Sequence, residues 1–430
     1  MVLLDTSARQ HWLIVAITTP AFVIFLSSNV VNAGNLFFNI LFSRWMGPEL
    51  FGDLALILTI KLSILGVLGA VQMAVSQRIS GDTSGDLGSL ARLNGFLFIG
   101  LWFLLPVVLA GFFLTEFDKL ISISSPISLV ILLFSIPFAA PLSILRGIAF
   151  GAQRTGKIVL TANVEMAVRL FGSIIAWKAG IGLDGVVFAI GLSIVAGWAV
   201  LADMLPFRSR TSPETGGYVK SLGYAAYPFA VLQLSQVISL DGEIFLASAF
   251  LAPADAGYVG ALSLFQRVEF FACFGLASVL LPSVIRAAGD RKQIRQAASP
   301  VALIYLCVVI PFILLVWAAP QTLISILVGN EFLAVTSSLL PAAFSAAAFT
   351  LSYLLATLLV ALDDRRGIWL IAFTAGVQLC AMAIASQNSG IGFSTLLVIK
   401  AVIQSALLGS LLVLMVLKFM RIPASQTTPD

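Results

Sequence analysis

The residues best able to do chemistry in this chain are charged side chains inside segments that are otherwise apolar. Eight ionisable residues fall in such segments: Lys61, Glu165, Arg169, Asp241, Glu243, Arg267, Glu269 and Lys400. A charged side chain at the centre of a bilayer costs about 2.5–3.5 kcal/mol on insertion scales, so these residues must face other protein groups or a water-filled cavity. Charges kept at this cost are candidates for binding an ion or a charged substrate.

Four cations are candidate contacts for an anionic substrate, because their helix positions place them at a similar depth. Lys61 and Arg267 occupy matching positions in the two halves of the chain, where both could face one midplane cavity. Arg169 and Lys400 are further candidates. Arg267 has an alternative role, because a carboxylate on the preceding helix, Asp241 or Glu243, could neutralise it. Both arrangements could occur in different states of a transport cycle.

The intramembrane carboxylates have two expected roles. Asp241 and Glu243 are two positions apart on one helix, about 200° of rotation, so one cavity cannot take both unless Gly242 breaks the helix. One of them is a candidate site for a coupling ion or a proton. Glu165 and Arg169 stand four residues apart, and this spacing favours a structural ion pair between them.

Four asparagines, Asn29, Asn32, Asn35 and Asn39, follow one another at helical spacing in the first apolar segment. Buried amides often join membrane helices through hydrogen bonds, and they can also bind sugar hydroxyls. We interpret Asn29 and Asn32 as helix contacts. The roles of Asn35 and Asn39 stay open, so both are candidate substrate contacts.

Catalytic and metal sites have little support in this sequence. His11 is the only histidine, which rules out a His-based metal cluster or catalytic triad. No paired carboxylate site stands out in the short outward connections, so we expect no enzyme activity, no metal and no cofactor. A net charge of +4 gives no reason to expect nucleic acid as a partner.

The elements that position these residues are membrane helices. Sixty per cent of the residues are hydrophobic, ten per cent are charged and the mean hydropathy is +1.05. Apolar runs long enough for a bilayer recur along the whole chain, which predicts an all-α polytopic membrane protein with about twelve transmembrane helices. The predicted helices span residues 12–42, 50–78, 93–114, 126–150, 158–178, 184–205, 219–250, 257–286, 298–318, 332–362, 367–386 and 391–418.

An internal repeat divides these helices into two sets of six. Pro48 and Gly52 lie in a connection that recurs 205 positions later, at Pro253 and Gly257. Because six is an even number, both sets cross the membrane in the same sense, and the repeats are parallel. The sequence therefore predicts an N-terminal six-helix lobe at residues 1–210 and a C-terminal lobe at residues 211–430, with a substrate cavity between them.

The positions of loop cations predict the orientation in the membrane. Only Arg44, Lys119 and Lys178 fall in connections on the side opposite the N-terminus, whereas most other Lys and Arg residues lie on the N-terminal side. By the positive-inside rule the N-terminal side is cytoplasmic. The protein is thus expected in the cell (inner or plasma) membrane, with both termini in the cytoplasm.

Three motifs resemble those of polysaccharide-type flippases, which export O-antigen and exopolysaccharide units on a lipid carrier. They are the turn RWMGPELFG at 44–52, its echo LAPADAG at 251–257 and the helix end LLPSVIR at 280–286. The resemblance covers most of the chain. It implies a two-lobed, V-shaped transporter of the multidrug/oligosaccharidyl-lipid/polysaccharide (MOP) superfamily that works by alternating access.

The function implied by this resemblance is the flipping of undecaprenyl-pyrophosphate-linked oligosaccharide from the cytoplasmic to the outer leaflet. Its partners would be the lipid-linked glycan, the lipid bilayer and the polysaccharide polymerase or export machinery. Two alternatives stay open at this point: an ion-coupled antiporter of drugs or other small molecules from the same superfamily, and a non-transporting scaffold of a polysaccharide assembly complex. A scaffold would leave the layer of charges unexplained.

Overall fold

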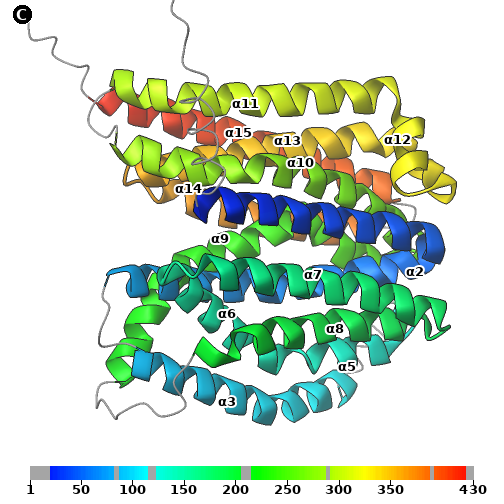
Figure 1. Ribbon diagram of the computed structural model, residues 1–430. Helices are drawn as coiled ribbons and strands as arrows, with labels where there is room; N and C mark the ends of the chain where they lie inside the picture. The colour runs from blue at the N-terminus through cyan, green and yellow to red at the C-terminus, as the bar shows by residue number, and fades with distance from the viewer. Residues whose placement is uncertain are drawn as a thin grey trace, which may run out of the picture. The chain divides into compact units, whose positions relative to one another are not determined.

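The computed structural model describes residues 20–81, 87–114, 123–204, 215–286, 291–387 and 392–422, and the regular elements in these ranges are helices (Figure 1). In chain order they are α2 (Pro20–Gly81), α3 (Leu87–Leu114), α5 (Pro126–Leu133), α6 (Ile136–Gly151), α7 (Thr155–Lys178), α8 (Gly182–Leu201), the 3₁₀ helix η1 (Ala202–Met204), α9 (Thr215–Phe250), α10 (Pro253–Arg286), α11 (Arg291–Ala318), α12 (Pro320–Leu327), the 3₁₀ helix η2 (Asn330–Val335), α13 (Thr336–Ala361), α14 (Arg366–Ser386) and α15 (Phe393–Arg421).

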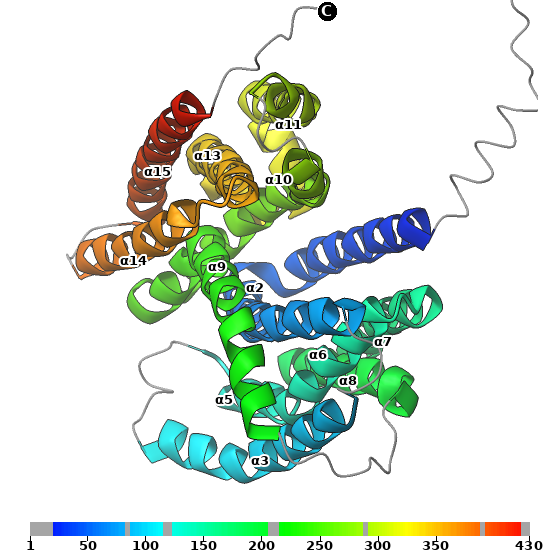
Figure 2. The ribbon, with the colours of Figure 1, turned by 90° about the vertical axis from the view of Figure 1, so that its left-hand side faces the viewer.

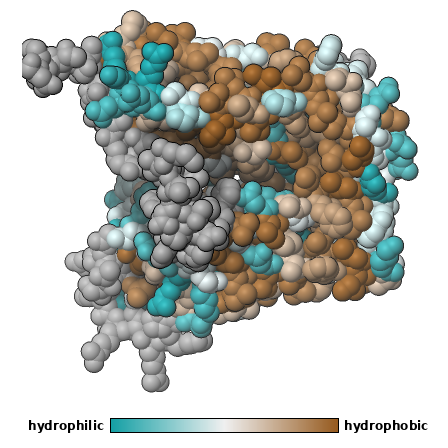
Figure 3. Space-filling view, turned by 45° about the horizontal axis from the view of Figure 1, so that its top comes forward, coloured by the Kyte–Doolittle hydropathy of each residue, from teal (hydrophilic) through white to brown (hydrophobic). Residues whose placement is uncertain are grey.

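The chain is a multi-pass helical membrane protein. Eleven segments of the described ranges are long and apolar enough to cross a membrane. The first, Leu26–Ser80, has 55 residues, which is about 80 Å of helix and more than twice the ~30 Å thickness of a hydrocarbon core. It therefore accounts for two crossings, and the predicted twelve-helix all-α fold is confirmed. On the face shown in Figure 3, apolar side chains cover the middle of the helices and hydrophilic ones gather towards their ends.

The long helix α2 is broken at the turn that the sequence singled out. Gly47 has φ +69° and ψ 178°, a conformation that L-residues with a side chain rarely adopt, and Pro48 follows it. A Cβ at Gly47 would also lie 2.9 Å from Glu331 Oε2. The predicted helices 12–42 and 50–78 are thus the two arms of α2, of which residues 12–19 lie outside the described ranges.

The chain forms two compact units, and neither is a continuous stretch. The first unit contains the described residues of Met1–Phe38, Ile64–Asp118 and Ser125–Ala230, and the second contains those of Asn39–Ser63, Lys119–Ser124 and Val231–Asp430. Helices α2 and α9 therefore contribute residues to both units. The predicted lobe boundary between residues 210 and 211, like both chain termini, lies outside the described ranges.

In the first unit, α7 packs along α8, and α6 packs against α3, α7 and α8. Buried Leu142 and Leu145 of α6 meet Ile194 of α8 in one apolar cluster. The backbones of α6 and α2 approach closely at Gly147, where a Cβ would lie 2.7 Å from Gln72 O and from Val75 Cβ. This close contact fixes the position of the neighbouring Arg146.

In the second unit, α13 packs against α10, α14 and α15 (Figure 2). The alanine-rich face of α13 is buried. The two echoing turns of the sequence meet in this unit. A Cβ at Gly257 would lie 1.8 Å from Pro48 O, and one at Gly52 would lie 2.7 Å from Gly257 N. The glycines of the repeated turn therefore allow two backbones to pack directly on each other.

Two predicted helices differ in detail from the observed ones, and one short helix is additional. The expected helix 126–150 is two helices, α5 and α6, separated by a turn at Phe134 and Ser135 just before Pro137. The helix expected at 332–362 begins with η2 before α13. A short additional helix, α12, precedes η2, because Pro320 favours a helix start and Gly329, at φ +112°, ends the segment.

Candidate substrate pocket

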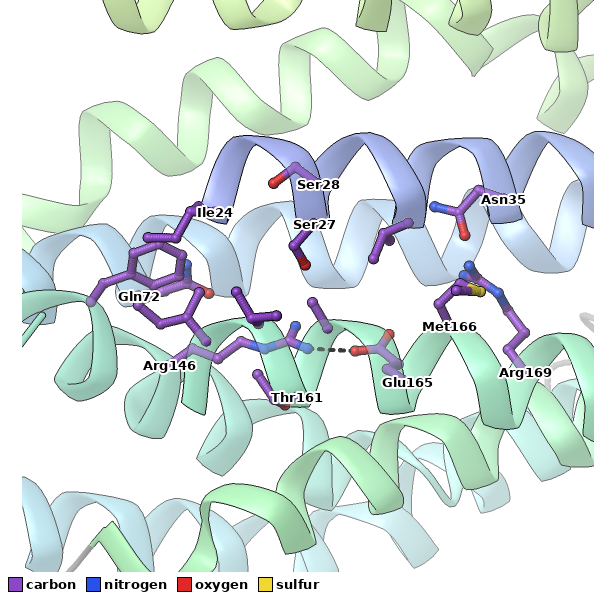
Figure 4. A pocket seen from close by; sticks show the side chains of 15 residues that line it. Ile24, Ser27, Ser28, Asn35, Gln72, Arg146, Thr161, Glu165, Met166 and Arg169 are labelled. Atoms are coloured by element: carbon purple, nitrogen blue, oxygen red, sulfur yellow. Dashed lines mark hydrogen bonds and ion pairs between the residues drawn. The ribbon is translucent and has the colours of Figure 1, made fainter. Parts of the chain in front are cut away.

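A partly polar pocket of about 300 Å³ lies inside the first unit, between both arms of α2, α6 and α7 (Figure 4). Its lining combines hydroxyl, amide and charged groups with apolar side chains. The polar lining residues are Ser27, Ser28, Asn35, Gln72, Arg146, Thr161, Glu165 and Arg169. A pocket of this size that brings charged and amide groups together within membrane-spanning helices is a candidate binding site.

Helical periodicity places the lining residues on facing stripes. On α7, Thr161, Glu165 and Arg169 are spaced by four residues, so they share one face over about 12 Å of helix. On α2, Ser27 and Asn35 are eight residues apart and line the opposite side of the pocket. The pocket is therefore elongated along α7, with polar groups at several depths.

An ion pair between α6 and α7 lies at the centre of the pocket. Arg146 Nη2 donates to Glu165 Oε2 at 2.6 Å, and the two side chains are only 21% and 13% exposed. Figure 4 shows the two groups pointing towards each other. This geometry corrects one sequence-based interpretation, since Glu165 was expected to pair with Arg169 and pairs with Arg146 instead. Glu165 is paired across helices because α6 brings Arg146 to it.

Arg169 lies at one end of the pocket, near Met166 and Asn35 (Figure 4). Its guanidinium carbon stands 5.7 Å from the centre of the Phe38 ring, a cation–π contact. Its Nε atom is buried and has no hydrogen-bond partner among the described residues. Arg169 thus brings a positive charge with unused donor capacity to the pocket.

Hydrogen bonds hold α7 in register with its neighbours. Asn163 Nδ2 donates to Ser27 Oγ of α2 at 2.6 Å, and Thr161 Oγ1 donates to Gly197 O of α8 at 3.0 Å. At Gly34, a Cβ would lie 2.6 Å from Met166 Sδ, so α2 and α7 are in close contact there. These contacts position the polar face of α7 against α2.

In the second unit, the two carboxylates of α9 pair with different cations. Arg267 Nε of α10 donates to Asp241 Oδ1 at 2.8 Å, and Arg267 Nη2 donates to Thr59 Oγ1 at 2.9 Å. Lys400 Nζ of α15 donates to Glu243 Oε1 at 2.5 Å. The two carboxylates have different partners because residues two positions apart on a helix point in different directions. The Arg267–Asp241 pair is the alternative role for Arg267 that the sequence analysis left open.

Lys400 belongs to a buried polar network that the sequence did not predict. Its ammonium also donates to Leu240 O at 2.7 Å and to Gln266 Oε1, and the side chain is fully buried. Nearby, Gln404 donates to Gln378, whose amide donates to Ser239 O at 3.3 Å. Glutamines within apolar helices could have indicated this network in the sequence, because a buried amide requires a hydrogen-bond partner.

The candidate substrate residues named from the sequence fall in different places. Arg169 and Asn35 line the pocket of the first unit. Lys61, Arg267 and Lys400 are in the second unit and do not line it, and Asn39 is half-buried in that unit. Arg146 is the main residue that sequence reasoning missed. No group of three or more His, Cys, Asp or Glu residues able to hold a metal ion occurs in the described part of the chain.

Comparison with known proteins identifies the fold. No protein-family model and no curated protein matches the sequence. Among solved structures, a multidrug resistance MATE family transporter of the MOP superfamily in an inward-facing conformation has a TM-score of 0.75 at 14% identity, covering 91% of this chain and 95% of its own. The lipid II flippase MurJ in an inward closed conformation has a TM-score of 0.71 at 16% identity, covering 93% and 89%. An outward-facing MATE family transporter has a TM-score of 0.64 at 15% identity, covering 93% and 94%. The chain therefore has the fold of these transporters and of this lipid II flippase.

Proposed function

We propose that the chain is a membrane flippase that moves undecaprenyl-pyrophosphate-linked oligosaccharide from the cytoplasmic to the outer leaflet by alternating access. The observation that carries this proposal is the pocket of the first unit, where the described lining brings two guanidinium groups, Arg146 and Arg169, together with one carboxylate, Glu165. The charged groups of the lining sum to a net positive charge, which a pyrophosphate head would neutralise.

Arginine suits this role because its planar guanidinium binds phosphate oxygens through paired hydrogen bonds. Arg169 keeps a buried Nε without a partner among the described residues. A buried donor without a partner costs about 1–3 kcal/mol, and an arriving phosphate oxygen would remove that cost. We therefore assign the pyrophosphate contact to Arg169, with Arg146 as the second cation.

The remaining lining suits the atoms next to the phosphates. Ser27, Ser28 and Asn35 offer hydroxyl and amide groups that can hydrogen-bond sugar hydroxyls. The pocket volume of about 300 Å³ is at the lower end of ligand sites, which suits a head group and its first sugar rather than a whole glycan. The lipid tail would stay in the bilayer, beside the exposed apolar helix faces.

The charged residues of the second unit are proposed to serve other states of the cycle. Arg267 is occupied by Asp241, and Lys400 by Glu243. If Arg267 separates from Asp241 in another state, Arg267 and Lys61 could bind the pyrophosphate there, as the sequence predicts for an anionic substrate. Asp241 and Glu243 stay the proposed ion-coupling residues, because each could exchange its cationic partner for a proton or an ion.

An ion-coupled antiporter of drugs or other small molecules is the second candidate function. It is favoured by the apolar lining of the same pocket, including Ile24, Val31, Phe150 and Met166, next to the acidic Glu165. A cationic drug would depend on Glu165, whereas a pyrophosphate lipid would depend on Arg169. The two functions therefore predict opposite sensitivities to mutation.

The test uses a bacterial strain that lacks its own O-antigen or exopolysaccharide flippase and makes surface polymer only when export is restored. Arg169→Gln should abolish polymer production at wild-type protein levels. Arg154→Gln is the matched control, because Arg154 immediately precedes α7 and is exposed outside the pocket. Normal export by Arg169→Gln, or drug resistance lost with Glu165→Gln but not with Arg169→Gln, would overturn the flippase proposal.

A further inference from the structure

The geometry of the pocket points to Glu165 as an internal competitor that holds Arg146 when no substrate is bound and so limits how tightly the substrate's phosphate binds. This inference rests on the proposed function and concerns the same pocket. It assigns to Glu165 the control of affinity and release, rather than a contact with the substrate.

The Glu165 carboxylate lies between the two cations, Arg146 and Arg169. Glu165 accepts a hydrogen bond from Arg146 at 2.6 Å, and it also interacts electrostatically with Arg169 one turn further along α7. The carboxylate therefore occupies the space where a phosphate group would meet both guanidinium groups. Among the described residues no other acidic group lines the pocket, and the lining polar groups other than Arg146, Arg169 and Glu165 are uncharged hydroxyls and amides.

Electrostatic repulsion between Glu165 and an incoming phosphate is strong in this pocket. Arg146 and Glu165 are mostly shielded from solvent, at 21% and 13% exposure, so charges near them are only weakly screened. A phosphate that approaches Arg146 must displace Glu165 or lie beside it, and like charges placed side by side at a binding site oppose binding. The carboxylate thus weakens a site that two arginines alone would make very tight.

Weaker phosphate binding is compatible with transport. A site that conducts its ligand must bind strongly enough to load it and weakly enough to release it. When the phosphate leaves, Glu165 can pair with Arg146 again, and the departing ligand does not leave an uncompensated cation in the membrane. Glu165 therefore acts as a positioning residue that speeds release.

The inference predicts a split between binding and export. Glu165→Gln keeps the shape of the side chain and removes its charge, so purified protein in nanodiscs should bind a short-chain prenyl pyrophosphate at least about tenfold more tightly than wild type. The same variant should export lipid-linked glycan more slowly in cells. In the Arg146→Gln background, adding Glu165→Gln should give little or no gain, because the contested cation is gone.

Asp203→Asn is the matched control, since it removes a carboxylate from the exposed Lys157–Asp203 pair of the same unit, whose oxygen lies 2.8 Å from Lys157 Nζ. Glu165→Asp serves as a second variant if Glu165→Gln is unstable, and its shorter side chain should give a smaller gain in the same direction. Unchanged or weaker binding by a folded Glu165 variant, or an equal gain without Arg146, would overturn the competition while leaving the flippase proposal intact. A wild-type protein that does not bind the prenyl pyrophosphate would overturn both.

Discussion

Neutralising one partner of the Arg267–Asp241 pair should destabilise the second unit much more than neutralising both. The two side chains are 12% and 4% exposed, so either group left alone would be a buried, uncompensated charge. Removal of one partner from a buried pair costs about 3–5 kcal/mol, whereas replacement of both by neutral groups is often close to neutral. We expect about 3 kcal/mol for Arg267→Gln or Asp241→Asn and about 1 kcal/mol for the double variant.

The assay is equilibrium unfolding of the purified variants in one detergent, together with glycan export in cells. The Lys157→Gln and Asp203→Asn variants provide the control cycle, because that pair is 35% and 67% exposed and solvent screening should leave only weak coupling between its charges. Additive destabilisation by Arg267→Gln and Asp241→Asn would refute the reasoning. Full export by a stable double variant would exclude Arg267 from the substrate site and Asp241 from ion coupling.

Two further predictions concern the backbone and a connecting loop. Gly257→Ala should cost more than about 4 kcal/mol or prevent folding, because its Cβ would lie 1.8 Å from Pro48 O. Gly275→Ala on the same helix is the control, because a Cβ added there would meet no atom within 4 Å. In thermal unfolding the control should change stability by less than about 1 kcal/mol. Hydrogen bonds from Arg366 lower the pKa of Asp364 to about 2, so Asp364→Asn should lower the unfolding temperature by a constant amount above about pH 4. That difference should shrink as the pH falls towards 2, and a difference that does not depend on pH would contradict the assignment.

Hydrophobicity and turn chemistry were sufficient to predict most of the fold from the sequence. Long apolar runs predicted the crossing helices, and the Gly47–Pro48 turn predicted the break in α2, because a bilayer and a positive φ impose requirements that sequence alone reveals. The repeated turn also indicated a special role for Gly257. The sequence could not indicate that this glycine packs on Pro48, since that contact depends on how distant helices meet.

The candidate site was harder to predict, because partner choice among charges is decided by tertiary packing. Local spacing favoured a Glu165–Arg169 pair, but α6 places Arg146 closer to the carboxylate. Arg146 was not among the candidate substrate residues, because it lies near the end of its helix. Asn35 and Arg169 were named as candidate substrate contacts, and the structure places both in one pocket, while their roles stay predictions.

The central claim is that the pocket of the first unit binds the pyrophosphate head of a lipid-linked oligosaccharide during flipping. The most direct measurement is transbilayer movement of a fluorescent undecaprenyl-pyrophosphate oligosaccharide in vesicles that contain only the purified protein. Wild type and Arg154→Gln should flip the lipid at similar rates, and Arg169→Gln should be slower by about tenfold or more, because a charged hydrogen bond contributes about 1.5–3 kcal/mol. Equal rates for Arg169→Gln and wild type, or no flipping by the wild-type protein, would contradict the account.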